Sequence, residues 1–289
     1  MVKYKYIYLN FWGVLVKVAG CENDINYINF FYKNFVQDFI EESKEIIMYT
    51  INFYCHVTPW RGVFESILYN DMLPKQIQVI DINGQLMRDF TFKDWSFLPS
   101  VLPPFDLSPL REKISVYSGA AIKDQFNNLS IILGQNYSGK TATAISLCKN
   151  YGYKMVSDSL IVVDNDSGKC LRYDSPLGFR RRNLYKNSQV LEKCESLFTV
   201  SQDTGLVALT RPEDYFGVKN SEGGKIDNIY ILHEVNKTRE VHVQSLKTPS
   251  IPFYPKKLPP EFLPEECYVV SFDCNASNEE KAKRIHELS

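Results

Sequence analysis

The sequence predicts an α/β protein with two domains, and three observations support this. The first hundred residues alternate short strand patterns with one helix pattern. A proline-dense segment, 98–109, then interrupts both patterns, because proline fits neither a helix interior nor a central strand. After it the pattern becomes strand, loop, helix and strand. We therefore expect an N-terminal mixed α/β domain over residues 1–100 and a second α/β domain over residues 110–289.

Composition excludes several classes of protein. The 289 residues are 44% hydrophobic and 13% aromatic, which is too much for a disordered chain. There are 33 Lys and Arg against 34 Asp and Glu, and this net charge of −1 argues against non-specific binding of nucleic acid. No apolar run reaches the roughly 18 residues of a membrane helix, and the polar N-terminus is unlike a signal peptide. We expect a soluble, cytoplasmic protein without nucleic-acid or membrane partners.

The cysteines and histidines agree with that compartment. The seven cysteines are an odd number and contain no C-x-x-C pair, and the four histidines are not spaced as a ligand pair. A structural zinc site is therefore not expected. We interpret the cysteines as reduced thiols that pack as small hydrophobic side chains.

The N-terminal hundred residues contain several strand patterns and one helix pattern. Apolar residues recur at helical spacing between residues 25 and 43, which predicts an amphipathic helix. Strands over 76–81 and 85–90 flank Asn83-Gly84, the pair that a type I′ hairpin turn requires. The other expected strands cover residues 3–9, 14–18 and 45–54.

The remainder of the chain predicts a second set of elements. A helix over 141–151 ends at Gly152, which is a favoured residue just beyond a helix C-terminus. A charged helix is expected over 278–289. Strands are expected over 114–122, 129–133 and 153–163, a hairpin strand over 169–173, and a strand pair over 228–232 and 239–243.

The strongest motif in the sequence lies at residues 134–141, Gly-Gln-Asn-Tyr-Ser-Gly-Lys-Thr, which fit G-x-x-x-x-G-K-[ST]. In such a loop, glycines let successive backbone N–H groups point into one anion-sized hollow, and the following helix adds its N-terminal dipole. Lys140 reaches the β- and γ-phosphates, and the Thr141 hydroxyl is available to Mg²⁺. The strand before and the helix after favour this interpretation over a glycine-rich turn without function.

The motif therefore predicts a nucleotide site. Tyr137 could stack on adenine, although a side chain that points into solvent is favoured. The residues predicted to bind nucleotide are Gly134, Asn136, Tyr137, Ser138, Gly139, Lys140, Thr141 and Ala142.

Asp158 is the candidate acid–base residue. It lies 18 residues after Lys140, on the strand pattern that follows the phosphate-loop helix. That path returns the chain to the loop, so Asp158 can accept a proton from an attacking hydroxyl or hold Mg²⁺ together with Thr141. The alternative is a surface aspartate at the edge of a strand. Asp174 and the pair Glu213-Asp214 are weaker candidates for a second metal contact.

Residues 114–183 resemble the HPr kinase/phosphorylase superfamily, whose core is shared distantly with phosphoenolpyruvate carboxykinase. The closest layout is that of the peptide-modifying, lasso-peptide-type HPr-kinase-like proteins. Four segments carry the resemblance: 116–122, similar to the strand before the phosphate-loop strand; the loop 134–141; 152–159, similar to G-x-x-x-x-x-D-D; and 173–182, similar to a proline-then-basic segment.

The resemblance implies a P-loop kinase core and an ATP- and Mg²⁺-dependent enzyme. Its acceptor would be a hydroxyl, with serine favoured, on a peptide or small protein such as a ribosomally made precursor. Asp158 would be the base. Arg180 and Arg181, with the adjacent Arg182, would bind phosphates or an acidic peptide, and one of them would stabilise the charge of the transferring phosphoryl group. A solvated basic loop is the alternative for these arginines.

One departure from the family pattern matters for function. The paired aspartates of the family are here Asp158-Ser159, which favours a dedicated kinase over a bifunctional one. The same departure leaves open a nucleotide-binding regulatory protein without phosphotransfer. A structural or interaction protein that binds no nucleotide is the third alternative. The N-terminal domain is a candidate for substrate binding, and a homo-oligomer stays open.

Overall fold

The computed structural model describes residues 4–37, 46–55, 62, 75–92, 108–180, 192, 196–201, 205–235, 241–247, 262–273 and 275–289. The chain divides into two compact units. Unit 1 contains Met1–Asp106 and Pro176–Arg211, and unit 2 contains Leu107–Ser175 and Pro212–Ser289. The division predicted from sequence, 1–100 and 110–289, differs because 176–211 groups with unit 1. The strands of the segment 176–211 pair with one another and not with the sheets of unit 2.

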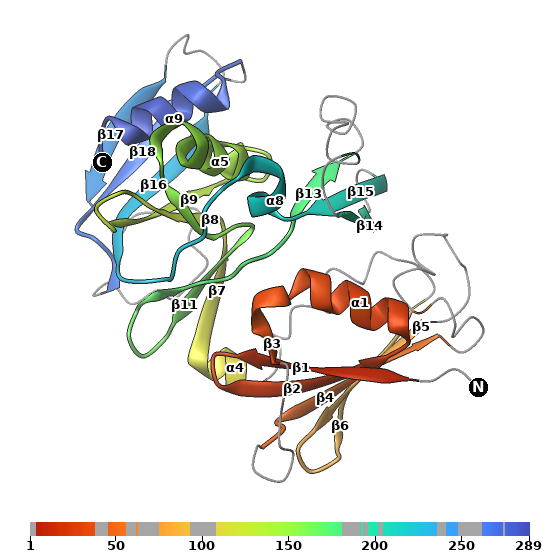
Figure 1. Cartoon of the computed structure of the whole chain (residues 1–289). Helices are drawn as coiled ribbons and strands as arrows, with labels where there is room; N and C mark the ends of the chain where they lie inside the picture. The colour runs from red at the N-terminus through yellow and green to blue at the C-terminus, as the bar shows by residue number, and fades with distance from the viewer. Residues whose placement is uncertain are drawn as a thin grey trace. The chain divides into compact units, whose positions relative to one another are not determined.

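Unit 1 is an α/β unit built on a six-stranded sheet of order β3-β1-β2-β4-β5-β6, beside which helix α1 (Glu22–Phe31) packs (Figure 1). A separate three-stranded sheet has the order β13-β15-β14. The strands are β1 (Lys5–Phe11), β2 (Val14–Gly20), β3 (Val36–Gln37), β4 (Tyr49–Cys55), β5 (Lys75–Asp81), β6 (Leu86–Phe92), β13 (Leu177–Arg180), β14 (Ser196–Ser201) and β15 (Gly205–Thr210).

The helix predicted over 25–43 is shorter than expected. It ends at Phe31, and a single 3-10 turn (Lys33–Phe35) leads into β3, while 38–45 lie outside the described residues. The Phe35 ring packs on Phe11 at a centroid distance of 4.7 Å, and Val36 pairs with Leu9 of β1. These tertiary contacts override the helical spacing of the apolar residues.

The predicted hairpin forms, but its turn is not of type I′. A type I′ turn needs positive φ at both central residues, and of the Asn83-Gly84 pair only Gly84 has one, at 77°. The Gly84 N–H donates to the carbonyl of Asp81 at 3.0 Å. The Asp81 carboxylate accepts from the N–H groups of Asn83 and Gln85, and this side-chain bridge favours the longer turn.

Unit 2 is also α/β and holds two sheets. The larger has the order β10-β8-β9-β16-β18-β17, and the smaller β12-β11-β7. The strands are β7 (Ile114–Ser118), β8 (Ala120–Lys123), β9 (Leu129–Gly134), β10 (Lys154–Ser157), β11 (Leu160–Asp164), β12 (Cys170–Leu171), β16 (Ile226–Glu234), β17 (His242–Lys247) and β18 (Glu266–Phe272). The helices are α4 (Ser108–Lys113), α5 (Lys140–Tyr151), α8 (Pro212–Phe216) and α9 (Asn278–His286).

Three strand predictions for unit 2 were wrong, and the one over 153–163 is described with the site. The strand predicted over 114–122 is two strands, β7 and β8, which belong to different sheets and are separated at Gly119. The predicted pairing of 228–232 with 239–243 does not occur, because β18 lies between β16 and β17. Strands β16 and β17 follow one another in the sequence but are not adjacent in the sheet, because β18, formed by residues 266–272, pairs with both of them.

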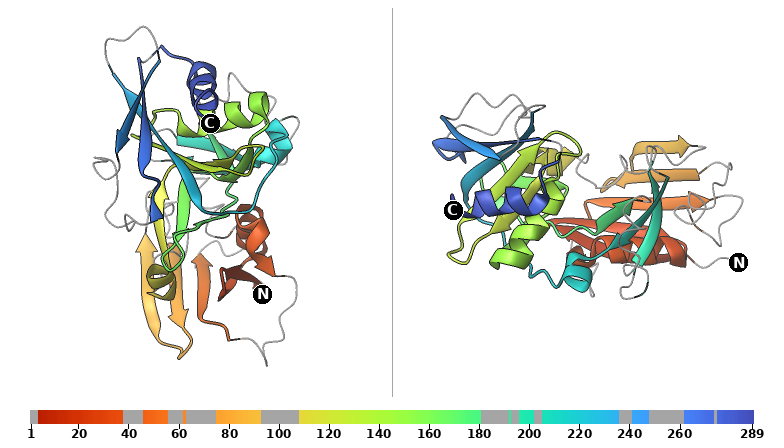
Figure 2. Two further views of the ribbon diagram at one scale, coloured as in Figure 1. Left: turned by 90° about the vertical axis from the view of Figure 1, so that its left-hand side faces the viewer. Right: turned by 90° about the horizontal axis from the view of Figure 1, so that it is seen from above.

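The two longer helices of unit 2 lie side by side over the larger sheet (Figures 1 and 2). Helix α5 confirms the predicted helix and ends at Gly152, whose φ is 73°. Helix α9 begins at a capping box formed by Ser277 and Glu280. Among the described residues, no helix is both long enough and apolar enough to cross a membrane.

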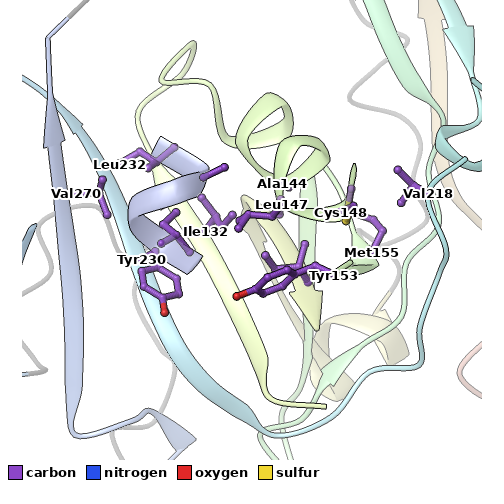
Figure 3. Close-up of a cluster of buried hydrophobic side chains, with 14 of the residues drawn as sticks. Ile132, Ala144, Leu147, Cys148, Tyr153, Met155, Val218, Tyr230, Leu232 and Val270 are labelled. Atoms are coloured by element: carbon purple, nitrogen blue, oxygen red, sulfur yellow. The ribbon is translucent and has the colours of Figure 1, made fainter. Parts of the chain in front are cut away.

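One hydrophobic core cluster of unit 2 lies between these helices and the larger sheet, as Figure 3 shows for part of it, and a second cluster includes residues of the smaller sheet. Leu147 of α5 points into the first cluster and is fully buried. We expect Leu147→Ala to lower the free energy of unfolding by about 2–5 kcal/mol, because the cavity adds to the lost transfer energy. Leu288→Ala, at a partly exposed leucine, is the matched control and is expected to change it by about 0.5 kcal/mol or less. Urea denaturation measures both, and equal losses would contradict the packing described here.

Candidate functional site

The loop between β9 and α5 is shaped by two glycines in backbone conformations that other residues rarely adopt. Gly134 has φ 148° and Gly139 has φ 90°. A Cβ on Gly134 would lie 2.6 Å from the carbonyl oxygen of Leu232, and one on Gly139 would lie 2.5 Å from Oδ1 of Asn278. The motif glycines are therefore required both by conformation and by close packing of the loop against β16 and α9.

Lys140, the motif lysine, lies over the loop. Its Nζ donates to the carbonyl oxygens of Gly134 at 3.0 Å and Gln135 at 2.8 Å. Burial lowers the pKa of Lys140, and the negative charge of Asp158 opposes that shift. The ammonium group is thus held at the loop, within the electrostatic reach of Asp158.

The remaining loop candidates differ in exposure. Asn136 and Tyr137 are exposed, and Tyr137 has φ 69°. Ser138 is buried, and its N–H donates to the carbonyl of Gln135 at 3.2 Å. Thr141 and Ala142 lie in the first turn of α5 and are partly exposed.

Asp158 lies at a break between two strands, not on the single strand predicted over 153–163. Strand β10 ends at Ser157 in the larger sheet and β11 begins at Leu160 in the smaller one. Ser159 accommodates the change of direction with a φ of 65°. Asp158 therefore belongs to neither strand.

The Asp158 carboxyl group is buried, with 3% of the residue exposed. Its Oδ2 accepts from the Ser159 hydroxyl at 3.1 Å, and its backbone oxygen accepts from the Ser175 hydroxyl at 3.0 Å. Oδ1 has no hydrogen-bond partner among the described residues. A buried acceptor without a partner indicates a group that is available to a ligand or to a transferred proton.

Burial raises the pKa of Asp158. The hydroxyls of Thr141 and Ser159 and the ammonium of Lys140 act against this shift. The structure thus brings three predicted site residues together, Lys140, Thr141 and Asp158, although they lie on two separate elements. A carboxyl group with a raised pKa beside a cation is the arrangement expected of a general base.

A small pocket borders Asp158, and Asp174 and Glu213 contribute to its wall. Asp174 is paired with Arg172, whose Nε lies 2.6 Å from its Oδ2, and Arg172 also bonds Glu222 at 2.8 Å. The pocket is lined by Met155, Asp158, Tyr173, Asp174, Ser175, Pro212, Glu213 and Asn220. The Asp174 carboxylate is thus paired with a cation, and its role as a second metal contact stays a prediction. Asp214 is exposed and does not line the pocket.

The predicted arginine cluster is not described by the structure. Arg180 ends β13, but its side chain, Arg181 and Arg182 lie outside the described residues. Within the described ranges there is no group of three or more His, Cys, Asp or Glu that could hold a metal ion. Any metal at the loop would therefore depend on Thr141, Asp158 and the ligand's own oxygens.

Helix α9 supplies residues that the sequence interpretation missed. Lys281 is buried and its Nζ donates to the carbonyl of Ser138 at 3.3 Å, while Asn278 packs against Gly139. The signal was present in the sequence, since Lys281 precedes Ala282 and lies four residues before Ile285 on the apolar face of an otherwise charged helix.

No known protein-family model matches the chain, and no curated protein matches it. Among solved structures, the Hpr(Ser) kinase/phosphatase from Coxiella burnetii matches 60% of this chain and 97% of that chain, at 12% sequence identity and a TM-score of 0.30. Such a distant match assigns neither fold family nor activity.

Proposed function

We propose that this protein is an ATP-dependent kinase with a P-loop core of the HPr kinase/phosphoenolpyruvate carboxykinase type. The observation that carries the proposal is the convergence of Lys140, Thr141 and the buried Asp158 at the loop 134–139. One element supplies an anion-binding loop with a cation, and another supplies a carboxyl group with an acceptor atom that has no partner. Phosphoryl transfer to a hydroxyl needs this combination.

In this proposal the loop binds the nucleotide phosphates. The backbone N–H groups of the loop and the N-terminal end of α5 stabilise negative charge without any proton transfer. Lys140 exchanges its bonds to the Gly134 and Gln135 carbonyls for bonds to phosphate oxygens. The bond to Gln135 is exposed and the bond to Gly134 is partly buried.

Asp158 takes the role of base. The acceptor hydroxyl attacks the γ-phosphorus, the bond from that phosphorus to the β,γ-bridging oxygen breaks, and the hydroxyl proton passes to the Asp158 carboxylate. The raised pKa of Asp158 makes it a better proton acceptor than an exposed aspartate. Ser159, which donates to Oδ2, leaves Oδ1 for this proton.

Two of these residues, Thr141 and Asp158, could also bind Mg²⁺, although they supply few ligand atoms. The Thr141 hydroxyl and the Asp158 carboxylate are hard oxygen ligands, and Mg²⁺ usually takes only one or two protein ligands besides phosphate oxygens and water. When bound, the ion would neutralise phosphate charge. Oδ1 of Asp158 has capacity for the ion, and this role is an alternative to accepting the hydroxyl proton at the same atom.

The acceptor we propose is a serine hydroxyl of a peptide or small protein. This choice is supported by the resemblance of 173–182 to peptide-modifying proteins and by the run of three arginines, which suits an acidic segment. Unit 1 is the proposed acceptor-binding unit. A reducing, cytoplasmic location agrees with Cys21, Cys148, Cys170 and Cys267, which are free thiols.

A second candidate, a regulatory protein that binds nucleotide without phosphotransfer, is favoured by one observation. Ser159 stands where the resembling family has a second carboxylate. Calorimetry with ATP and Mg²⁺, followed by transfer of radiolabelled γ-phosphate to serine-containing peptides, separates the candidates. Binding with transfer supports the kinase, binding without transfer or hydrolysis supports the regulator, and absence of binding excludes both.

A further inference from the structure

Lys281 of α9 is buried directly behind the loop 134–139. The residue is 5% exposed, and its Nζ donates to the carbonyl oxygen of Ser138 at 3.3 Å and to Oδ1 of Asn278 at 3.4 Å. The ammonium group also lies 3.8 Å from the centroid of the Phe272 ring. These contacts fix the position of the cation against the loop that carries the phosphate motif.

Among the described residues, no carboxylate is in direct contact with the Lys281 ammonium group. No described carboxylate forms an ion pair with it, and Glu234 acts on it only through space. Burial lowers the pKa of Lys281 accordingly. Burial of an ammonium group without an ion-pair partner costs folding free energy, and here hydrogen bonds to two neutral oxygens and the contact with the Phe272 ring offset that cost.

The contact with Ser138 also constrains the backbone of the loop. In a trans peptide unit the C=O and N–H groups point in opposite directions. Because the Ser138 carbonyl is bonded to Lys281, the Gly139 N–H points away from α9. Gly139 can hold this orientation because its φ of 90° is in the left-handed region, and its Cα lies too close to Asn278 for any side chain.

We propose that Lys281 is a second cation of the phosphate site and a positioning residue for the loop. It aims the Gly139 N–H toward the bound phosphates and adds positive potential from behind the loop. Lys140 and Lys281 therefore act on opposite sides of the same loop, one in contact with phosphate and one through the Ser138–Gly139 peptide. This inference rests on the proposed nucleotide site and deepens it.

Three variants test this inference. Lys281→Met keeps the stem over Phe272 but removes the charge and the hydrogen bond, and Lys281→Arg keeps both. Lys283→Met is the matched control, because Lys283 lies on the same helix with its side chain 67% exposed. Calorimetry with MgATP is expected to show about tenfold to hundredfold weaker binding for Lys281→Met, near-normal binding for Lys281→Arg and no change for Lys283→Met.

A second readout separates positioning from general damage and needs no nucleotide. In ¹⁵N–¹H spectra, the Gly139 amide signal is expected to move in Lys281→Met and to stay in place in Lys283→Met, while thermal unfolding shows that the variant is folded. Wild-type affinity together with an unmoved Gly139 signal in Lys281→Met would overturn the inference. A lost affinity accompanied by a lower thermal midpoint in both Lys281 variants would reduce Lys281 to a structural role. If the wild-type protein binds neither MgATP nor inorganic triphosphate, the proposed function itself fails.

Discussion

Replacement of Lys140 by methionine is expected to weaken MgATP binding by about a hundredfold. The ammonium group is the only charged donor that the described residues place over the loop carbonyls of Gly134 and Gln135. Its loss removes charge-assisted hydrogen bonds to phosphate, each worth about 1.5–3 kcal/mol. Methionine keeps the length of the stem, so the change isolates the charge. Isothermal titration calorimetry measures the effect directly.

The matched control for Lys140 is Lys149 in the last turn of the same helix. Its side chain is exposed, and its Nζ lies 5.5 Å from the centroid of the Phe216 ring, away from the loop. Lys149→Met is expected to leave the affinity for MgATP unchanged. Equal weakening by both substitutions would show that net charge, and not the position of Lys140, controls binding.

The parts of the site that sequence predicts well are those set by local chemistry. The strand, loop and helix over 129–151 form as predicted because adjacent residues specify each of them: apolar residues for β9, glycines for the loop, and small helix-forming residues for α5. The position of Gly152 at the end of α5 is predictable for the same reason. Local signals of this kind do not depend on the rest of the fold.

The parts that sequence misses depend on contacts between distant segments. Strand β16 lies between β9 and β18, and no local pattern specifies that order. The apolar residues on both sides of Ser157-Asp158-Ser159 predict one continuous strand, whereas β10 and β11 belong to different sheets and the chain breaks at this polar triplet. Lys281 shares the helix face of Ala282 and Ile285, but its contact with the loop depends on the packing of α9, which no local pattern specifies.

Replacement of Asp158 by asparagine is expected to slow phosphate transfer by about 10²–10⁴-fold while leaving MgATP affinity close to that of the wild-type protein. Asparagine keeps the shape of the side chain but cannot accept the hydroxyl proton. Asp166→Asn, at an exposed aspartate in the turn before β12, is the control and is expected to transfer normally. Single-turnover transfer of radiolabelled phosphate measures the rate, and unchanged transfer by Asp158→Asn would exclude Asp158 as the base.

The same carboxyl group links activity to pH. A base must be deprotonated, so the transfer rate of the wild-type enzyme is expected to rise with pH through the raised pKa of Asp158, a limb that Asp158→Asn lacks. The free energy of unfolding depends on pH in the opposite direction. Between the ordinary and the raised pKa, the native state binds more protons than the unfolded state, so the free energy of unfolding falls as pH rises.

Above the raised pKa, burial of the Asp158 charge opposes folding, and the asparagine variant avoids this penalty. Asp158→Asn should therefore unfold at a higher temperature than the wild-type protein at neutral pH, with an advantage that shrinks as the pH falls. Thermal unfolding at several pH values measures this difference. A variant that loses transfer and gains stability would identify Asp158 as a residue retained for chemistry at the expense of the fold, whereas a variant that loses both would indicate a structural carboxyl group.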